Sequence, residues 1–156
     1  MSGTAPNLAN MAGTPIPHVT AITLGVRDVE TAHRFYTEGL GFAPISRMGD
    51  EISFVQAGPG LLLALWKVAS MPGEYGSVGH GPLAPPMSLG HNVSDEALVE
   101  ALYRRAVAAG ASPIGEPRRQ DWGGVSACIA DPDGFRWDFV YNPAFTVAAD
   151  GAVTGV

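Results

Sequence analysis

The sequence predicts an α+β fold of two tandem βαβββ modules whose curved sheets form an open, barrel-like cleft with the helices outside. Two observations lead to this prediction. A strand–helix–three-strand pattern occurs twice along the chain. Corresponding positions also lie at similar offsets, since Val26 and Val93 are 67 positions apart and Gly60 and Gly134 are 74 apart. Internal repetition is stronger evidence for a fold than any single element. With 46% hydrophobic residues among 156, the chain can bury a core.

Changes in composition divide the chain into five parts. The predicted parts are a flexible N-terminal lead-in (1–17), a first βαβββ module (18–68), a Gly/Pro-rich linker or lid loop (69–86), a second βαβββ module (87–145) and a C-terminal tail or hairpin (146–156). The segment ASMPGEYGSVGHGPLAPP at 69–86 is too rich in glycine and proline to predict a helix or strand.

The first module opens with HVTAITLGVRD (18–28), whose β-branched and apolar residues predict a strand. Asp28 is a suitable N-cap for the helix that follows. That helix has apolar residues at one-sided spacing and is expected to stop at Gly39 and Gly41. Three further strands are predicted at about 43–48, 51–57 and 61–68.

The second module repeats this order. MSLGHNVSD (87–95) predicts a strand, and EALVEALYRRAVAAG (96–110) predicts a helix that ends at Gly110. Three strands are predicted at about 112–117, 124–130 and 135–142, and an Asp-Gly turn in the tail allows a terminal hairpin.

Charge and cysteine content narrow the functional classes. The formal charge of −6 and the two isolated arginine pairs argue against a nucleic-acid partner, because phosphate binding needs clustered basic residues. The single Cys128 excludes an internal disulfide and a Cys-based zinc site. There is no apolar run of membrane-spanning length and no secretory signal at the start, so we expect a cytoplasmic protein without a membrane partner.

Two motifs resemble one known superfamily. ITLGVRDVETAHRFYTEGLGF is similar to the opening of vicinal oxygen chelate proteins, the glyoxalase/bleomycin resistance/dioxygenase superfamily, and DPDGFRWDFVYNP resembles its closing signature. The resemblance covers about residues 18–145 and implies the fold predicted above. It also implies a homodimer. It leaves the chemistry open, because this superfamily includes lyases, isomerases, dioxygenases and binding proteins.

The resemblance implies four metal-ligand positions in metal-dependent members, on the first and last strand of each module. These positions carry Ala21, Ala64, Ser88 and Asp138 here. Alanine has no donor atom, and one hydroxyl with one carboxylate rarely holds a divalent ion. We therefore expect no metal site of the family type and no other cofactor.

Strand alternation predicts which side chains line the cleft instead. Arg136 and Asp138 share one face of the last strand and are the candidate catalytic pair. Asp138 would act as acid or base, and Arg136 would hold a ligand anion. The alternative is that the two residues form an ion pair that only closes one end of the barrel. His80 is either a lid residue or solvated, and Trp66 either stacks on a ligand or belongs to the core. The predicted ligand-binding residues are Thr23, Ala64, Trp66, Ser88, Asn92, Trp122, Cys128 and His80.

Three functional hypotheses follow. The first is a binder or resistance-type protein that holds a small organic molecule in a metal-free apolar cleft. The second is a metal-independent isomerase, cyclase, lyase or hydrolase that uses Asp138. The third is a metal-dependent glyoxalase-like lyase or dioxygenase, against which the two alanines argue.

Overall fold

The computed structural model describes residue 13 and residues 16–156, so most of the predicted lead-in lies outside the described residues. The first module contains a four-stranded sheet in the order β1-β4-β3-β2. Its elements are β1 (Ala21–Val26), α1 (Val29–Arg34), the π-helical turn η2 (Phe35–Gly39), β2 (Pro44–Met48), β3 (Ile52–Gly58) and β4 (Leu61–Lys67). The Asp28 carboxylate accepts a hydrogen bond from the Thr31 backbone N–H and caps α1, as the sequence predicts.

The second module repeats the arrangement with a sheet in the order β5-β8-β7-β6. Its elements are β5 (Ser88–Val93), α3 (Ala97–Ala108), β6 (Ser112–Arg119), β7 (Val125–Ala130) and β8 (Arg136–Tyr141). A short antiparallel hairpin of β9 (Thr146–Val147) and β10 (Val153–Gly155) ends the chain.

Strand registers show that the two modules are equivalent. β1 pairs with β4 in parallel, with Thr23 opposite Ala64, and β5 pairs with β8 in parallel, with Gly90 opposite Asp138. These pairs repeat the sequence offsets of 67 and 74 positions. The prediction of two tandem modules in an α+β fold is therefore confirmed, and neither sheet closes into a barrel.

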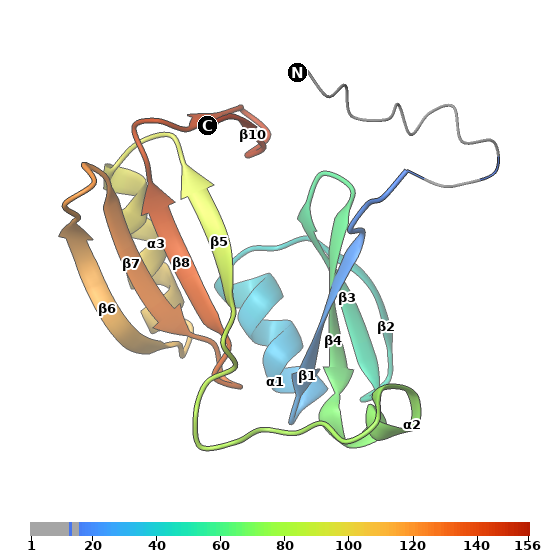
Figure 1. Cartoon of the computed structure of the whole chain (residues 1–156). Helices are drawn as coiled ribbons and strands as arrows, with labels where there is room; N and C mark the ends of the chain where they lie inside the picture. The colour runs from blue at the N-terminus through green and yellow to red at the C-terminus, as the bar shows by residue number, and fades with distance from the viewer. Residues whose placement is uncertain (1–12, 14–15) are drawn as a thin grey trace, which may run out of the picture.

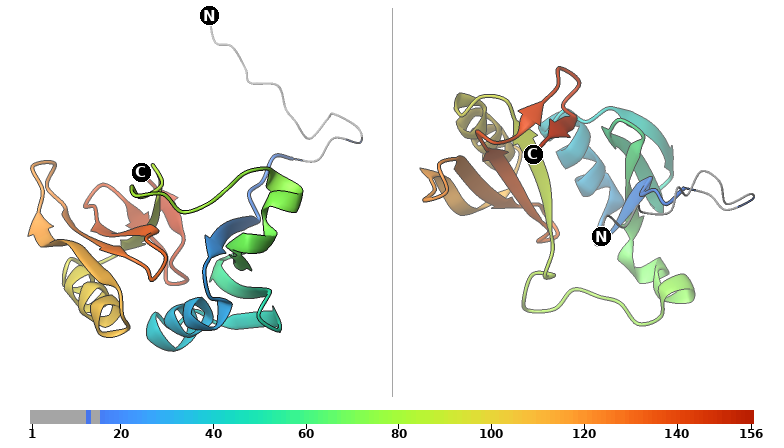
Figure 2. Two further views of the ribbon diagram at one scale, coloured as in Figure 1. Left: turned by 90° about the horizontal axis from the view of Figure 1, so that it is seen from below. Right: turned by 45° about the horizontal axis from the view of Figure 1, so that its top comes forward.

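Each sheet has one face covered by its helix and one face turned the other way. Leu24 and Val26 of β1 point toward α1 and are buried, while Phe139 of β8 points toward α3. Figure 1 shows β1 and β5 as the neighbouring edges of the two sheets. In the left view of Figure 2, α1 and α3 lie on the same side of the strands. The cleft side of the strands is therefore opposite the helices.

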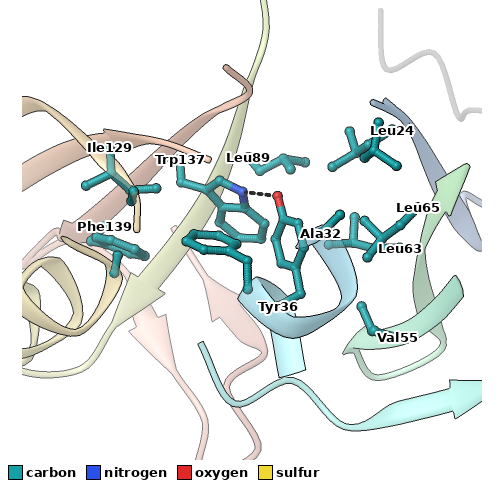
Figure 3. Close-up of a cluster of buried hydrophobic side chains, with 14 of the residues drawn as sticks. Leu24, Ala32, Tyr36, Val55, Leu63, Leu65, Leu89, Ile129, Trp137 and Phe139 are labelled. Atoms are coloured by element: carbon teal, nitrogen blue, oxygen red, sulfur yellow. Dashed lines mark hydrogen bonds between the residues drawn. The ribbon is translucent and has the colours of Figure 1, made fainter. Parts of the chain in front are cut away.

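The π-helical turn η2 joins the cores of the two modules. Phe35 and Tyr36 are consecutive in the chain, yet both side chains are buried. The Tyr36 ring lies 5.9 Å from the Trp137 ring of β8, and the Trp137 ring lies 5.7 Å from the Phe42 ring. Figure 3 shows Tyr36 between Trp137 on one side and the leucines of the first sheet on the other. One continuous hydrophobic core therefore spans both modules.

The segment predicted as a linker contains short helices that the sequence analysis did not predict. A 3₁₀ turn η3 (Val68–Ser70) and a single helical turn α2 (Pro72–Tyr75) follow β4 directly. Pro72 occupies the first turn of α2, where its missing N–H costs nothing. From Gly76 to Met87 the chain has no regular structure and crosses the side of the strands opposite α1 and α3 (Figure 2). None of the described helices is long and apolar enough to cross a membrane.

Candidate functional site

A cavity of about 760 Å³ lies between the two modules and beneath the linker; we call it the linker cavity. Its walls come from three parts of the chain. β1 and the residue after it contribute Thr23, Gly25 and Arg27, the linker contributes residues 78–86, and the turn before β8 contributes residues 130–136. The rest of the lining includes Val68, Met71, Ser112 and Ile114. The linker therefore forms one wall of the cavity, on the side of the sheets away from the helices.

The turn at 131–134 is built by its two carboxylates. The Oδ1 atom of Asp131 accepts hydrogen bonds from the backbone N–H groups of Asp133 and Phe135, both at 2.9 Å. Gly134 has a φ of 91°, a left-handed conformation that glycine adopts without strain. Asp133 accepts from the backbone N–H of Arg27 at 2.8 Å and from its guanidinium at 3.4 Å. Asp131 stabilises the turn and Asp133 binds it to the end of β1, so both carboxylates have structural roles.

Asp131 also connects the turn to the first module through Tyr36. The Tyr36 hydroxyl donates to Oδ2 of Asp131 at 2.5 Å and accepts from the Trp137 indole N–H at 3.0 Å (Figure 3 shows the second bond). Burial raises the pKa of Tyr36 well above its usual value, and the nearby Asp131 charge raises it further. Burial also raises the pKa of Asp131, against the effect of its hydrogen bonds from Tyr36 and the backbone. Tyr36 therefore stays protonated and acts as a donor near neutral pH.

Arg136, a predicted catalytic residue, opens β8 and lines the linker cavity. Its Nη1 group donates to the Gly134 carbonyl at 3.0 Å. Among the described residues, no carboxylate lies within ion-pair distance of its guanidinium. Arg136 and Asp138 therefore do not form an ion pair. The alternative that these two residues only close the barrel as an ion pair is therefore wrong.

His80 extends from the linker to the turn before β8. Its ring packs edge-on against Phe135 with a centroid distance of 6.0 Å, and both residues line the linker cavity. Its Nε2 atom is the one buried side-chain nitrogen or oxygen without a hydrogen-bond partner among the described residues. The structure thus places His80 in the wall of the cavity, half-buried rather than fully solvated.

Asp138 lies farther along β8 than Arg136, on the same face of the sheet but outside the linker cavity. Its neighbours across the sheet are Gly90 on β5 and Cys128 on β7. Burial raises the pKa of the Cys128 thiol, and the Asp138 carboxylate raises it further. Cys128 is thus a protonated thiol near neutral pH rather than an activated nucleophile.

Most of the other predicted site residues lie outside the linker cavity. Thr23 lines the cavity, but its strand neighbour Ala64 is buried in β4. Trp66 donates its indole N–H to Glu51 at 2.9 Å and packs against Tyr75. Ser88 and Asn92 lie on β5, opposite Arg136 and Val140. Trp122 lies in the β6–β7 connection, at the opposite end of the sheet from the 131–134 turn, and its side chain is 52% exposed. Of the predicted site residues, Thr23, His80 and Arg136 therefore line the linker cavity and the others do not, although Ala64 and Ser88 are strand neighbours of Thr23 and Arg136.

The donor atoms at the four family-type positions do not fit a metal ion. Two of the positions are alanines, Ser88 offers a hydroxyl, and only Asp138 offers a carboxylate. Across residue 13 and residues 16–156, no cluster of three or more His, Cys, Asp or Glu side chains could hold a metal. The described residues therefore offer no donor set that fits a metal ion in this cleft.

The sequence patterns did not predict several of the cavity residues. Arg27, just after β1, faces the cavity, and Met71 lies in the short helical segment after β4. Ile114 reaches the cavity from β6. Strand alternation could have predicted that Ile114 faces the cavity. No local sequence pattern predicts that the linker lies against residues 130–136.

The fold and sequence now define the class of protein. The sequence model of the glyoxalase/bleomycin resistance protein/dioxygenase superfamily matches residues 16–139, which is most of the chain. A glyoxalase-related enzyme from Fulvimarina pelagi is 40% identical, aligns over 89% of this chain and 98% of its own, and superposes with a TM-score of 0.80. The chain belongs to this superfamily.

More distant structures share the fold alone. A glyoxalase/bleomycin resistance protein/dioxygenase from Nocardioides is 23% identical over 95% of this chain and 94% of its own, with a TM-score of 0.69. A lactoylglutathione lyase from Agrobacterium tumefaciens is 19% identical over 82% of this chain and 96% of its own, with a TM-score of 0.63. Comparison with curated proteins gave no match.

Proposed function

We propose that this protein binds a small organic molecule in the linker cavity without a metal ion at the family's ligand positions. The observation that carries the proposal is a cavity of about 760 Å³, within the size range of small-molecule sites, in a chain whose family-type positions lack donor atoms. The cavity combines apolar side chains with several polar groups, among them Thr23, His80 and Arg136. Such a lining suits a binder or resistance-type protein that sequesters its ligand.

A neutral fluorescent probe tests the proposed pocket. N-phenyl-1-naphthylamine gains fluorescence in an apolar site, so its titration should show saturable binding of one probe per chain. Ile114→Trp places an indole at the mouth of the cavity from a side chain that is 50% exposed, and should weaken binding about tenfold or more. Leu98→Trp, on the exposed side of α3, is the matched control and should bind like wild type. Equal binding by wild type and Ile114→Trp would refute the location, and binding of neither this probe nor an acidic analogue of it would refute the proposal.

A metal-independent enzyme is the second candidate. The observation in its favour is that Asp138 forms no ion pair with any of the described residues. Its neighbour on β5 is Gly90, which has no side chain, and the space beside Gly90 is open. A half-buried carboxylate without an ion pair, on the open face of a sheet, can act as an acid or base. In this case Asp138→Asn abolishes turnover of a substrate that still binds. Retained turnover in Asp138→Asn would rule this candidate out.

We also propose that the protein is a homodimer. The edge strand β2 leaves Ile45 and Met48 50% and 61% exposed, and an apolar edge of this kind is commonly covered by another chain. Sedimentation velocity tests the proposal, and Met48→Lys should shift a dimer toward the monomer. A wild-type protein that sediments as a monomer at micromolar concentration would contradict it.

A further inference from the structure

We propose that the ligand of the linker cavity carries an anionic group, a carboxylate or a group of similar shape and charge, and that Arg136 binds it. This inference rests on the proposed function, because it assigns a chemical class to the molecule held in the same cavity. Arg136 lies in the wall of the cavity at the start of β8.

The guanidinium of Arg136 has unused donors. An arginine side chain carries five N–H donors in a planar fork. The described residues supply one acceptor, the Gly134 carbonyl, and no carboxylate within ion-pair distance. The side chain is half-buried, so water reaches it less freely than it reaches a surface arginine. A planar anion matches the remaining donors in a two-bond arrangement.

The two acids in the same wall are directed into the protein rather than toward a ligand. Asp131 is 3% exposed and accepts from two backbone N–H groups and from Tyr36. Asp133 is 8% exposed and accepts from the backbone and guanidinium of Arg27. Arg27 thus has a carboxylate partner in Asp133, whereas Arg136 has none among the described residues. Of the two arginines that line the cavity, Arg136 is the one without a carboxylate partner among the described residues, so its charge is left for a ligand.

The remaining walls indicate what the anionic group is attached to. The apolar part of the lining includes Val68, Met71, Val78, Leu83, Ile114 and Phe135. His80 adds a buried Nε2 atom without a partner beside Phe135, on the linker side of the cavity. The ligand class is therefore an amphipathic organic acid, with its acid group at Arg136 and an apolar body between the linker and the sheets.

Two fluorescent probes that differ only by an acid group test the inference. 8-Anilino-1-naphthalenesulfonate has the ring system of N-phenyl-1-naphthylamine plus one sulfonate. We expect wild-type protein to bind the sulfonate probe about tenfold more tightly than the neutral probe, with the difference decreasing as salt is added. Arg136→Gln should bring the two affinities together by weakening the sulfonate probe alone. Arg136→Lys, which keeps the charge but loses the fork, should give an intermediate difference.

Arg104→Gln is the matched control, because Arg104 lies on α3 and pairs with Glu100. It should leave both affinities unchanged, and circular dichroism confirms that each variant is folded. Equal affinities in wild type, or a preference that survives Arg136→Gln, would overturn the inference while the neutral probe still reports a binding cavity. If wild-type protein binds neither probe, the proposed function itself fails.

Discussion

The Tyr36 hydroxyl donates a 2.5 Å hydrogen bond to Asp131, a residue 95 positions away in the other module. Tyr36 belongs to the π-helical turn after α1, and Asp131 begins the turn that leads into β8. The same hydroxyl accepts from Trp137, so one phenol oxygen connects a helix, a turn and a strand. Because this turn also forms a wall of the linker cavity, the contact between modules supports the proposed binding site.

Removing this hydroxyl should destabilise the protein. Tyr36→Phe keeps the buried ring but leaves the Asp131 carboxylate with one fewer donor and the Trp137 N–H without its acceptor. We expect a loss of about 1–3 kcal/mol in the free energy of unfolding, measured by urea denaturation. Tyr103→Phe is the control, since Tyr103 is half-buried and makes no side-chain hydrogen bond within the described residues. Equal stability of Tyr36→Phe and wild type would contradict the structural role.

Gly90 and Gly124 should respond differently to substitution by alanine. A Cβ atom at Gly124 would lie 1.8 Å from the Trp122 ring and 2.3 Å from the Tyr141 carbonyl oxygen, whereas one at Gly90 would meet nothing within 4 Å. Gly124→Ala should therefore lower the free energy of unfolding by about 1–3 kcal/mol, and Gly90→Ala should leave it nearly unchanged. Urea denaturation measures both. A tolerated Gly124→Ala would show that the Trp122 loop is packed differently.

Stability should fall in mildly acidic solution because of His91. Burial lowers its pKa from the usual 6.5, so the unfolded chain binds this proton more readily than the folded protein. The stabilisation is complete above pH 6.5 and is lost as the pH falls from there through the folded-state pKa. His91→Phe, which keeps an aromatic ring against Phe139, should lose less stability than wild type between pH 7.5 and 5.5. Urea denaturation at both pH values measures the difference. Equal losses of stability in wild type and His91→Phe would show that His91 does not cause the pH dependence.

Much of the fold follows from local sequence patterns. Strand alternation correctly turns Trp137 and Phe139 into the core, because side chains on a strand point to opposite faces in turn. It also places Arg136 and Asp138 on one face, as the register confirms. The similar offsets between Val26 and Val93 and between Gly60 and Gly134 predict the two equivalent sheets.

The arrangement around the cavity does not follow from such patterns. Alternation says which way Arg136 points but not which groups from distant segments surround it. The linker lies against Phe135 through His80, and the turn binds Tyr36 and Arg27 from the first module. Each of these contacts joins segments far apart in the chain, and the glycine- and proline-rich linker carries no periodicity that would place it. For this reason the structure brings together only three of the predicted site residues in the linker cavity.

The metal content of the protein decides whether its cleft works without a metal ion. Untagged protein purified without chelators would be analysed for metals as isolated and again after incubation with Zn²⁺, Ni²⁺, Mn²⁺ or Fe²⁺. Because two of the four family-type positions are alanines, we expect far less than one metal ion per chain in every sample, with no change caused by Asp138→Ala. A stoichiometric metal ion that is lost in Asp138→Ala would contradict a metal-free cleft and favour a glyoxalase- or dioxygenase-like metalloenzyme.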